Sequence, residues 1–164
     1  MFDYAKLLAE LPANISIGYS SISLRRPSEL AKQQVGYSVR ANGTSLSGNG
    51  DGDWHSNWLV IGNEDLCGNP IFIDTAAPGY PVFTAPNGEG RWDPEPVAVS
   101  LVGLREALAV VGRAAKGREN PVALEENPFS GTDREIILKE IQEHNPDIDL
   151  SFWSVVIGNE PGDD

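Results

Sequence analysis

Histidine and cysteine, which bind zinc and serve as catalytic bases and nucleophiles, are scarce in this sequence. The 164 residues include one cysteine, Cys67, and two histidines, His55 and His144. These residues do not have the short spacing of zinc motifs such as CxxC or HExxH. A catalytic thiol would need a histidine beside Cys67, which falls in a predicted tight turn between two strands. The sequence therefore predicts neither a zinc site nor a catalytic cysteine.

Acidic side chains and glycines are common, but their spacing selects no catalytic or phosphate-binding motif. Residues 49–53, NGDGD, resemble the start of a calcium-binding EF-hand loop. Trp54 then occupies the position that requires glycine, and Val60 the position that requires glutamate. We interpret the segment as a solvated turn, with a looser cation site as the open alternative. Because GxxxxGK[ST] and GxSxG are also missing, we expect a non-enzymatic protein without cofactors.

The net charge of −12 is unevenly distributed along the chain. Residues 49–95 carry eight acidic side chains and one basic one, and residues 119–164 carry twelve acidic and two basic side chains. Such a surface repels phosphate backbones, which argues against direct nucleic-acid binding. It attracts basic proteins and speeds their encounter. The alternative interpretation is that the acidic surface maintains solubility.

Aromatic and acidic residues occur together in and around the strand-rich part of the chain. Trp and Tyr are frequent anchors of protein interfaces, although most aromatic side chains belong to the core. Asp74, at a predicted strand end, either forms a turn or faces a partner. The predicted binding residues for a protein partner are Asp51, Asp53, Trp54, Asp74, Glu89, Trp92, Asp93 and Glu95.

The elements that position these residues are predicted to be mostly short strands. Apolar runs typical of strands occur at 58–61, 70–74, 80–84 and 96–99, separated by short segments rich in Gly, Pro, Asn and Asp. Short connections join antiparallel neighbours, since parallel pairing needs a long crossover. Alternation also predicts a strand from Ile15, with a break near Ser20, and a last strand at 152–157.

Helices are predicted on either side of the strand-rich region. Candidate helices begin after Asp3 and at Pro27, and a longer one follows Ser100, with leucines at helical spacing. A capping box is predicted at 132–135, before another helix. We therefore expect one α+β domain over residues 1–164, with an antiparallel sheet flanked by helices and an acidic extension from about residue 121.

The predicted location is the cytoplasm. A single cysteine cannot form an internal disulfide, which favours a reducing compartment. The N-terminal sequence lacks the basic and apolar regions of a secretory signal, and no apolar stretch has the length of a membrane span. We expect no membrane association.

Part of the strand-rich region resembles the SMI1/KNR4 (SUKH) superfamily. The resemblance comprises WLVIG at 58–62, CGNPIFID at 67–74, YPVF at 80–83, and VAVS at 97–100 before a helix. It implies an α+β fold with no catalytic residues. Bacterial members are mainly immunity proteins that bind and neutralise toxins, and fungal members are regulatory scaffolds. The resemblance thus favours an immunity protein that binds a basic toxin domain. The alternatives are a scaffold of the same fold and, third, an enzyme or small-ligand-binding protein.

Overall fold

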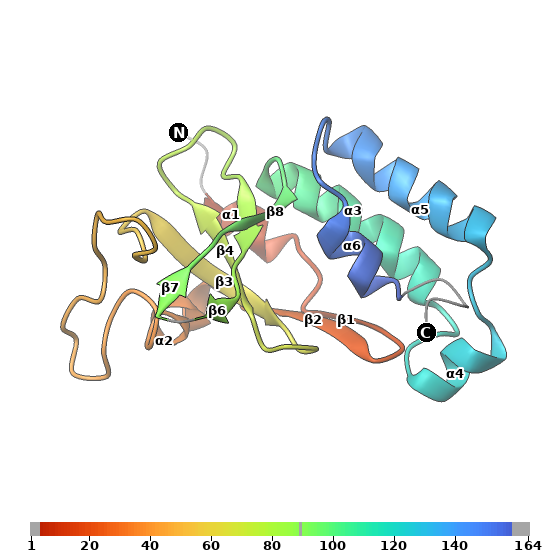
Figure 1. Ribbon diagram of the computed structural model, residues 1–164, viewed down its shortest axis with the longest axis horizontal. Helices are drawn as coiled ribbons and strands as arrows, with labels where there is room; N and C mark the ends of the chain where they lie inside the picture. The colour runs from red at the N-terminus through yellow and green to blue at the C-terminus, as the bar shows by residue number, and fades with distance from the viewer. Residues whose placement is uncertain (1–3, 89, 159–164) are drawn as a thin grey trace.

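The computed structural model describes residues 4–88 and 90–158 and combines an antiparallel sheet with helices (Figure 1). The main sheet has the order β1-β2-β3-β4-β5-β8, with every pair antiparallel, and β6 and β7 form a separate hairpin. The predicted α+β architecture is therefore confirmed. The strands are β1 Asn14–Ile17, β2 Ser20–Leu24, β3 Trp58–Glu64, β4 Pro70–Asp74, β5 Val82–Thr84, β6 Asn87–Gly88, β7 Arg91–Trp92 and β8 Glu95–Ala98.

Helices gather largely on one side of the main sheet, where α3 and α5 run side by side and α6 lies beside β8 (Figure 1). The long helix α3 begins as predicted, because Ser100 Oγ accepts a hydrogen bond of 2.9 Å from Gly103 N. Its buried residues include Leu104 and Leu108. The helices are α1 Tyr4–Ala9, the short 3₁₀ helix η1 Pro27–Glu29, α2 Leu30–Gln33, α3 Leu101–Ala115, α4 Pro121–Glu126, α5 Gly131–His144 and α6 Ser151–Val156.

The two faces of the main sheet bury different kinds of side chain. Alternation along β4 places Ile71 and Ile73 in the large core beneath the helices and Phe72 in a smaller aromatic core on the other face. The segment between α2 and β3 covers this second face. Gln34 anchors that segment: its amide donates to Val60 O (2.8 Å) and accepts from Val60 N (2.9 Å), as a neighbouring strand would.

The prediction of a last strand at 152–157 is wrong, because this segment forms helix α6. Trp153, Val156 and Ile157 are all buried, and this spacing of three and four is that of one helix face. The similar sequences WLVIGNE and WSVVIGNE therefore begin with different structures, a strand at Trp58 and a helix here. In β3 the chain stays extended to Glu64, so the turn expected at residues 62–63 begins later.

Two further predicted boundaries differ from the structure. The break expected near Ser20 is a tight turn at residues 18–19 that joins β1 and β2 into a hairpin. The capping box of α5 is formed by Ser130 and Asp133 rather than by residues 132–135. The backbone N–H of Ser130 donates to the Asp133 carboxylate, and this bond, followed by that from the Ser130 hydroxyl, lowers the pKa of Asp133. Ser130 precedes the first turn, so its side chain can reach the free N–H groups there.

Candidate functional site

The predicted binding residues lie at two different ends of the main sheet. Trp92 lines a hollow beside Pro70, the first residue of β4. Glu95 begins β8 at the same end of the sheet. Asp74 lies at the far end of β4, where its carboxylate accepts a hydrogen bond of 2.9 Å from Ala76 N. Of the two roles predicted for Asp74, this geometry is that of a turn residue, so Asp74 is separate from the others.

Arg91 links two of the predicted acidic side chains. Its guanidinium lies 3.3 Å from Asp51 Oδ2 and 3.0 Å from Asp93 Oδ1. A hydrogen bond from Arg91 to Asp93, followed by the charges of Asp93 and Asp51, raises the pKa of Arg91. The backbone N–H of Trp92 also donates to Gly52 O at 2.9 Å. These contacts bring Asp51, Trp92 and Asp93 together, although ion pairs this exposed stabilise a fold very little.

Asp53 closes a turn within the same loop. Its carboxylate accepts a hydrogen bond of 2.9 Å from Gly50 N, which agrees with the interpretation of residues 49–53 as a turn. Across residues 4–88 and 90–158, no group of three or more His, Cys, Asp or Glu side chains is placed to hold a metal ion. Glu89, another predicted binding residue, lies outside the described residues.

Trp54 cannot be the surface anchor that we predicted, because it is 2% exposed. Its ring centroid lies 4.7 to 5.3 Å from those of Tyr37, Trp58, Phe72 and Trp92. Its indole N–H donates to Trp58 O at 3.3 Å. Tyr37, Trp58 and Trp92 pack around Trp54 on this sheet face, so Trp54 lies inside the aromatic core. This structural role takes it out of the candidate site.

Tyr37 and Trp92 line a hollow of about 400 Å³ at the edge of this aromatic cluster. Their ring centroids are 5.6 Å apart, and both side chains are partly exposed. Burial raises the pKa of the Tyr37 phenol, which therefore stays protonated at neutral pH. Residues 67–70 line the hollow opposite the rings. Partly buried Trp and Tyr rings beside a hollow are typical of interface anchors.

The β3–β4 turn is held by Glu64, which the sequence analysis did not select. The Glu64 carboxylate accepts hydrogen bonds from the backbone N–H groups of Leu66, Cys67 and Asn69, at 2.9 to 3.3 Å. An acidic residue just before a glycine-containing turn is a signal that could have identified it. Three backbone donors fix its carboxylate, so Glu64 shapes the turn.

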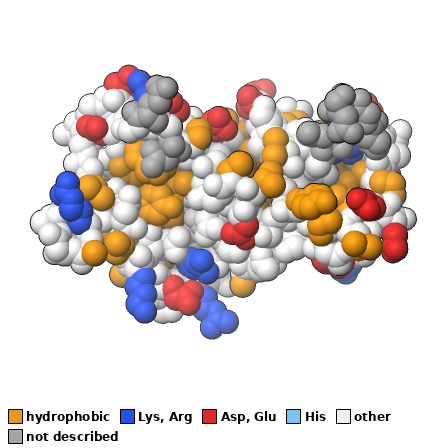
Figure 2. Space-filling model, turned by 60° about the horizontal axis from the view of Figure 1, so that its bottom comes forward, with side chains coloured by type: hydrophobic (Ala, Val, Ile, Leu, Met, Phe, Trp, Pro, Cys, Tyr) orange, Lys and Arg blue, Asp and Glu red, His pale blue; other side chains and the backbone are white. Residues whose placement is uncertain are grey.

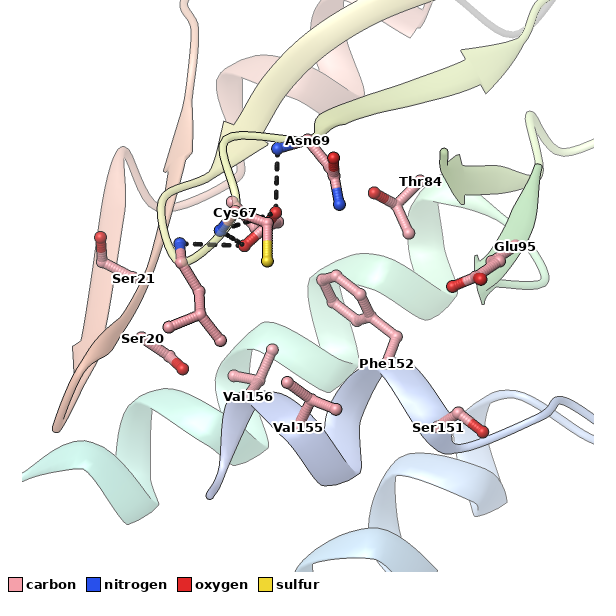
Figure 3. A pocket seen from close by; sticks show the side chains of 12 residues that line it. Ser20, Ser21, Cys67, Asn69, Thr84, Glu95, Ser151, Phe152, Val155 and Val156 are labelled. Carbon is pink, nitrogen blue, oxygen red and sulfur yellow. Dashed lines mark hydrogen bonds between the residues drawn. The ribbon is translucent and has the colours of Figure 1, made fainter. Parts of the chain in front are cut away.

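A second hollow, an apolar groove of about 170 Å³, lies between the β3–β4 turn and α6 (Figure 3). Leu66 from the turn and Val155 from α6 contribute to its walls, and they are 49% and 51% exposed. Phe152 and the Cys67 thiol point toward one another inside it (Figure 3). Both hollows include Cys67 and Asn69 in their linings, so they adjoin across the turn.

Neither histidine lies near Cys67. The ring of His55 stacks on Trp58 at 4.4 Å and 8°, and Trp58 pairs with Asp74 at the far end of the sheet. His144 ends α5, next to the buried Asn145, whose side chain contacts the segment after β8. The Cys–His arrangement considered from the sequence is therefore not formed.

The β6–β7 hairpin with the loop at residues 49–53, the β3–β4 turn and α6, together with Tyr37 and Glu95, form what we call the docking face. In Figure 2 hydrophobic side chains form separate patches across the middle of the view, and most of the visible Lys and Arg side chains lie toward its lower and left margins. Carboxylates outnumber Arg91 on the docking face; they belong to Asp51, Asp53, Glu64, Asp65, Asp93 and Glu95.

In comparisons with known proteins, no protein-family model, no curated protein and no solved structure matches this chain. None of the described helices is long and apolar enough to cross a membrane.

Proposed function

We propose that the chain is a binding protein for a basic protein, which it contacts through the docking face. The observation that carries this proposal is the position of Trp92 and Tyr37, partly exposed beside a hollow and flanked by Asp51 and Asp93. Aromatic anchors contribute most of the binding energy in many protein interfaces. Surrounding carboxylates favour a cationic partner and speed its approach.

Within this class, we propose an immunity protein that neutralises a toxin. The resemblance of residues 58–100 to the SMI1/KNR4 superfamily supports this assignment, and so does the charge of the chain. A nuclease or other toxin that acts on nucleic acid presents a cationic groove to its substrate. A protein of net charge −12 can occupy such a groove and compete with the substrate.

Co-expression and co-purification with the toxin-like protein encoded beside this gene test the proposal. Binding of a basic toxin domain and protection of the cells are the expected results. A neighbourhood without a toxin gene, together with binding to a cellular regulator, would instead identify a scaffold.

The substitution Trp92→Ala is expected to weaken partner binding by about 30-fold or more, as loss of an aromatic anchor does. Isothermal titration calorimetry with the purified partner measures this change. Val122→Ala is the control, since Val122 is 62% exposed on α4, outside the segments that form the docking face. Equal affinities of the Trp92 variant and the original protein would contradict the role of the aromatic hollow.

A second variant tests the charge without removing an aromatic ring. The double substitution Asp51→Asn and Asp93→Asn is expected to slow association severalfold and to reduce its dependence on salt. Stopped-flow kinetics at roughly 50 to 300 mM salt measure both effects. This range lies on both sides of the physiological ionic strength, at which exposed charges are partly screened. An association rate that is independent of salt in the original protein would contradict electrostatic attraction.

A further inference from the structure

The apolar groove between the β3–β4 turn and α6 has walls that favour an aliphatic chain. Leu66 and Val155 are about half exposed, and Phe152 and Val156 contribute further apolar surface. Exposed aliphatic side chains that share one concave surface mark binding sites more often than scattered ones do. The volume of about 170 Å³ suits a single side chain rather than a helix or a large ligand.

Several polar side chains along the groove already have partners inside the protein. Glu64 is held by three backbone donors, Thr84 Oγ1 donates to Pro70 O, and Ser151 Oγ donates to Asp149. Glu95 differs from them. Within the part of the chain that the structure describes, its carboxylate has neither an ion pair nor a hydrogen bond.

The position of Glu95 defines the charge that the groove prefers. Figure 3 shows its side chain at the edge of the groove, with the carboxylate directed toward the side on which Phe152 lies. An occupant must therefore combine a flexible aliphatic stem with a positive end, which are the two parts of a lysine or arginine side chain. A cation beside Phe152 also gains from the electrons of the ring.

We propose that this groove receives one lysine or arginine side chain of the basic partner. The stem lies between Leu66 and Val155, and the positive end pairs with Glu95. This inference rests on the proposed function for the source of the side chain. Within the docking face it adds a specific contact, on the other side of the β3–β4 turn from the aromatic hollow.

Titration with n-butylammonium, which reproduces the lysine side chain, tests the groove without any partner protein. Amide chemical shifts of residues 66–69 and 151–156 in two-dimensional NMR spectra are the readout. We expect n-butylammonium to bind about threefold more tightly than n-butanol, as a surface ion pair allows, and butyrate to bind more weakly than both. Equal binding of the amine and the alcohol, or shifts confined to other residues, would overturn the proposal.

Three variants locate the two parts of the contact. Glu95→Gln is expected to abolish the preference for the amine over the alcohol, whereas Glu125→Gln, an exposed carboxylate on α4, keeps it. Val155→Thr keeps the shape but adds a hydroxyl, and is expected to weaken the amine and the alcohol equally. A preference that survives Glu95→Gln refutes the assignment of Glu95.

The outcomes also separate this inference from the proposed function. If n-butylammonium does not bind while Trp92→Ala still disrupts a complex with a basic protein, the groove assignment alone is wrong. If n-butylammonium binds as expected but no basic protein does, the proposed function is wrong and the groove remains a site for aliphatic cations.

Discussion

Trp153→Ala is expected to lower the free energy of unfolding by about 4 kcal/mol, as is typical when a large buried aromatic side chain is removed. Trp153 is 0% exposed, and its indole N–H donates to Val97 O at 2.8 Å. The substitution removes the main contact of α6 with the core and leaves a backbone carbonyl of the edge strand β8 without its partner. Urea unfolding followed by circular dichroism measures the change.

Trp153→Phe separates the two contributions. It keeps most of the apolar contact and removes the hydrogen bond, so a loss of about 1 to 2 kcal/mol is expected. If Trp153→Ala lowers the free energy of unfolding by less than about 1 kcal/mol, α6 does not pack on β8 as described. The groove that α6 lines would then lose its structural basis.

Asn145→Ala is expected to destabilise the protein by about 3 kcal/mol, because it removes three hydrogen bonds between a buried side chain and the backbone. Asn145 is 0% exposed. Its amide accepts from Val99 N (3.0 Å) and donates to Gly103 O (3.1 Å) and Ile141 O (3.0 Å). One side chain thus joins the end of β8 to α3 and α5. Thermal and urea unfolding measure the effect, and Asn57→Ala, at an exposed asparagine, is the control.

Gly103 provides a stricter test of the same contact. A β-carbon at Gly103 would overlap Asn145 Oδ1, so Gly103→Ala is expected to destabilise the original protein. In the Asn145→Ala background the overlap with Oδ1 is gone and a 3.3 Å approach to His144 O remains. The helix preference of alanine, about 1 kcal/mol over glycine, then offsets much of the cost. Additive effects of the two substitutions would contradict the described packing of Asn145 on α3.

Asn145 and Gly103 lie outside the segments that form the docking face, which has a consequence for the binding experiments. Asn145→Ala is expected to change stability while leaving partner affinity unchanged under conditions in which the protein stays folded. The double substitution Asp51→Asn and Asp93→Asn is expected to weaken partner binding while leaving stability nearly unchanged, since the exposed ion pairs of Arg91 contribute little to stability. A variant set that separates the two properties in this way would support a core contact at Asn145 that is separate from the binding surface.

Local signals in the sequence predicted much of the architecture. Short Gly- and Pro-rich connections predicted antiparallel neighbours, and Ser100 predicted the start of α3, because turns and caps depend on residues close in the chain. The grouping of Trp92 with Asp93 followed from their adjacency. The same local reasoning failed at 152–157, where a short apolar run fits both a strand and a helix.

Contacts between distant segments needed the tertiary structure. Trp54 and Trp92 are both aromatic residues near loops, and their local sequence does not say that Trp54 fills the centre of a sheet face while Trp92 stays partly exposed. Asn145 and Gln34 read as ordinary surface residues, yet each pairs with backbone groups far away in the chain. Burial and polar pairing depend on which segments meet, and the sequence alone does not contain that information in local form.

The sequence by itself determined the charge of the protein, its class of fold and the absence of a recognisable catalytic motif, since these follow from composition and short-range pattern. The tertiary structure decided where the surfaces are: it placed Glu95 at an apolar groove, separated Asp74 from the other acidic residues, and buried Trp54. The physical reason is that each strand has two ends and two faces. The packing of elements distant in the chain determines which end and which face stay exposed to solvent, where a partner can bind.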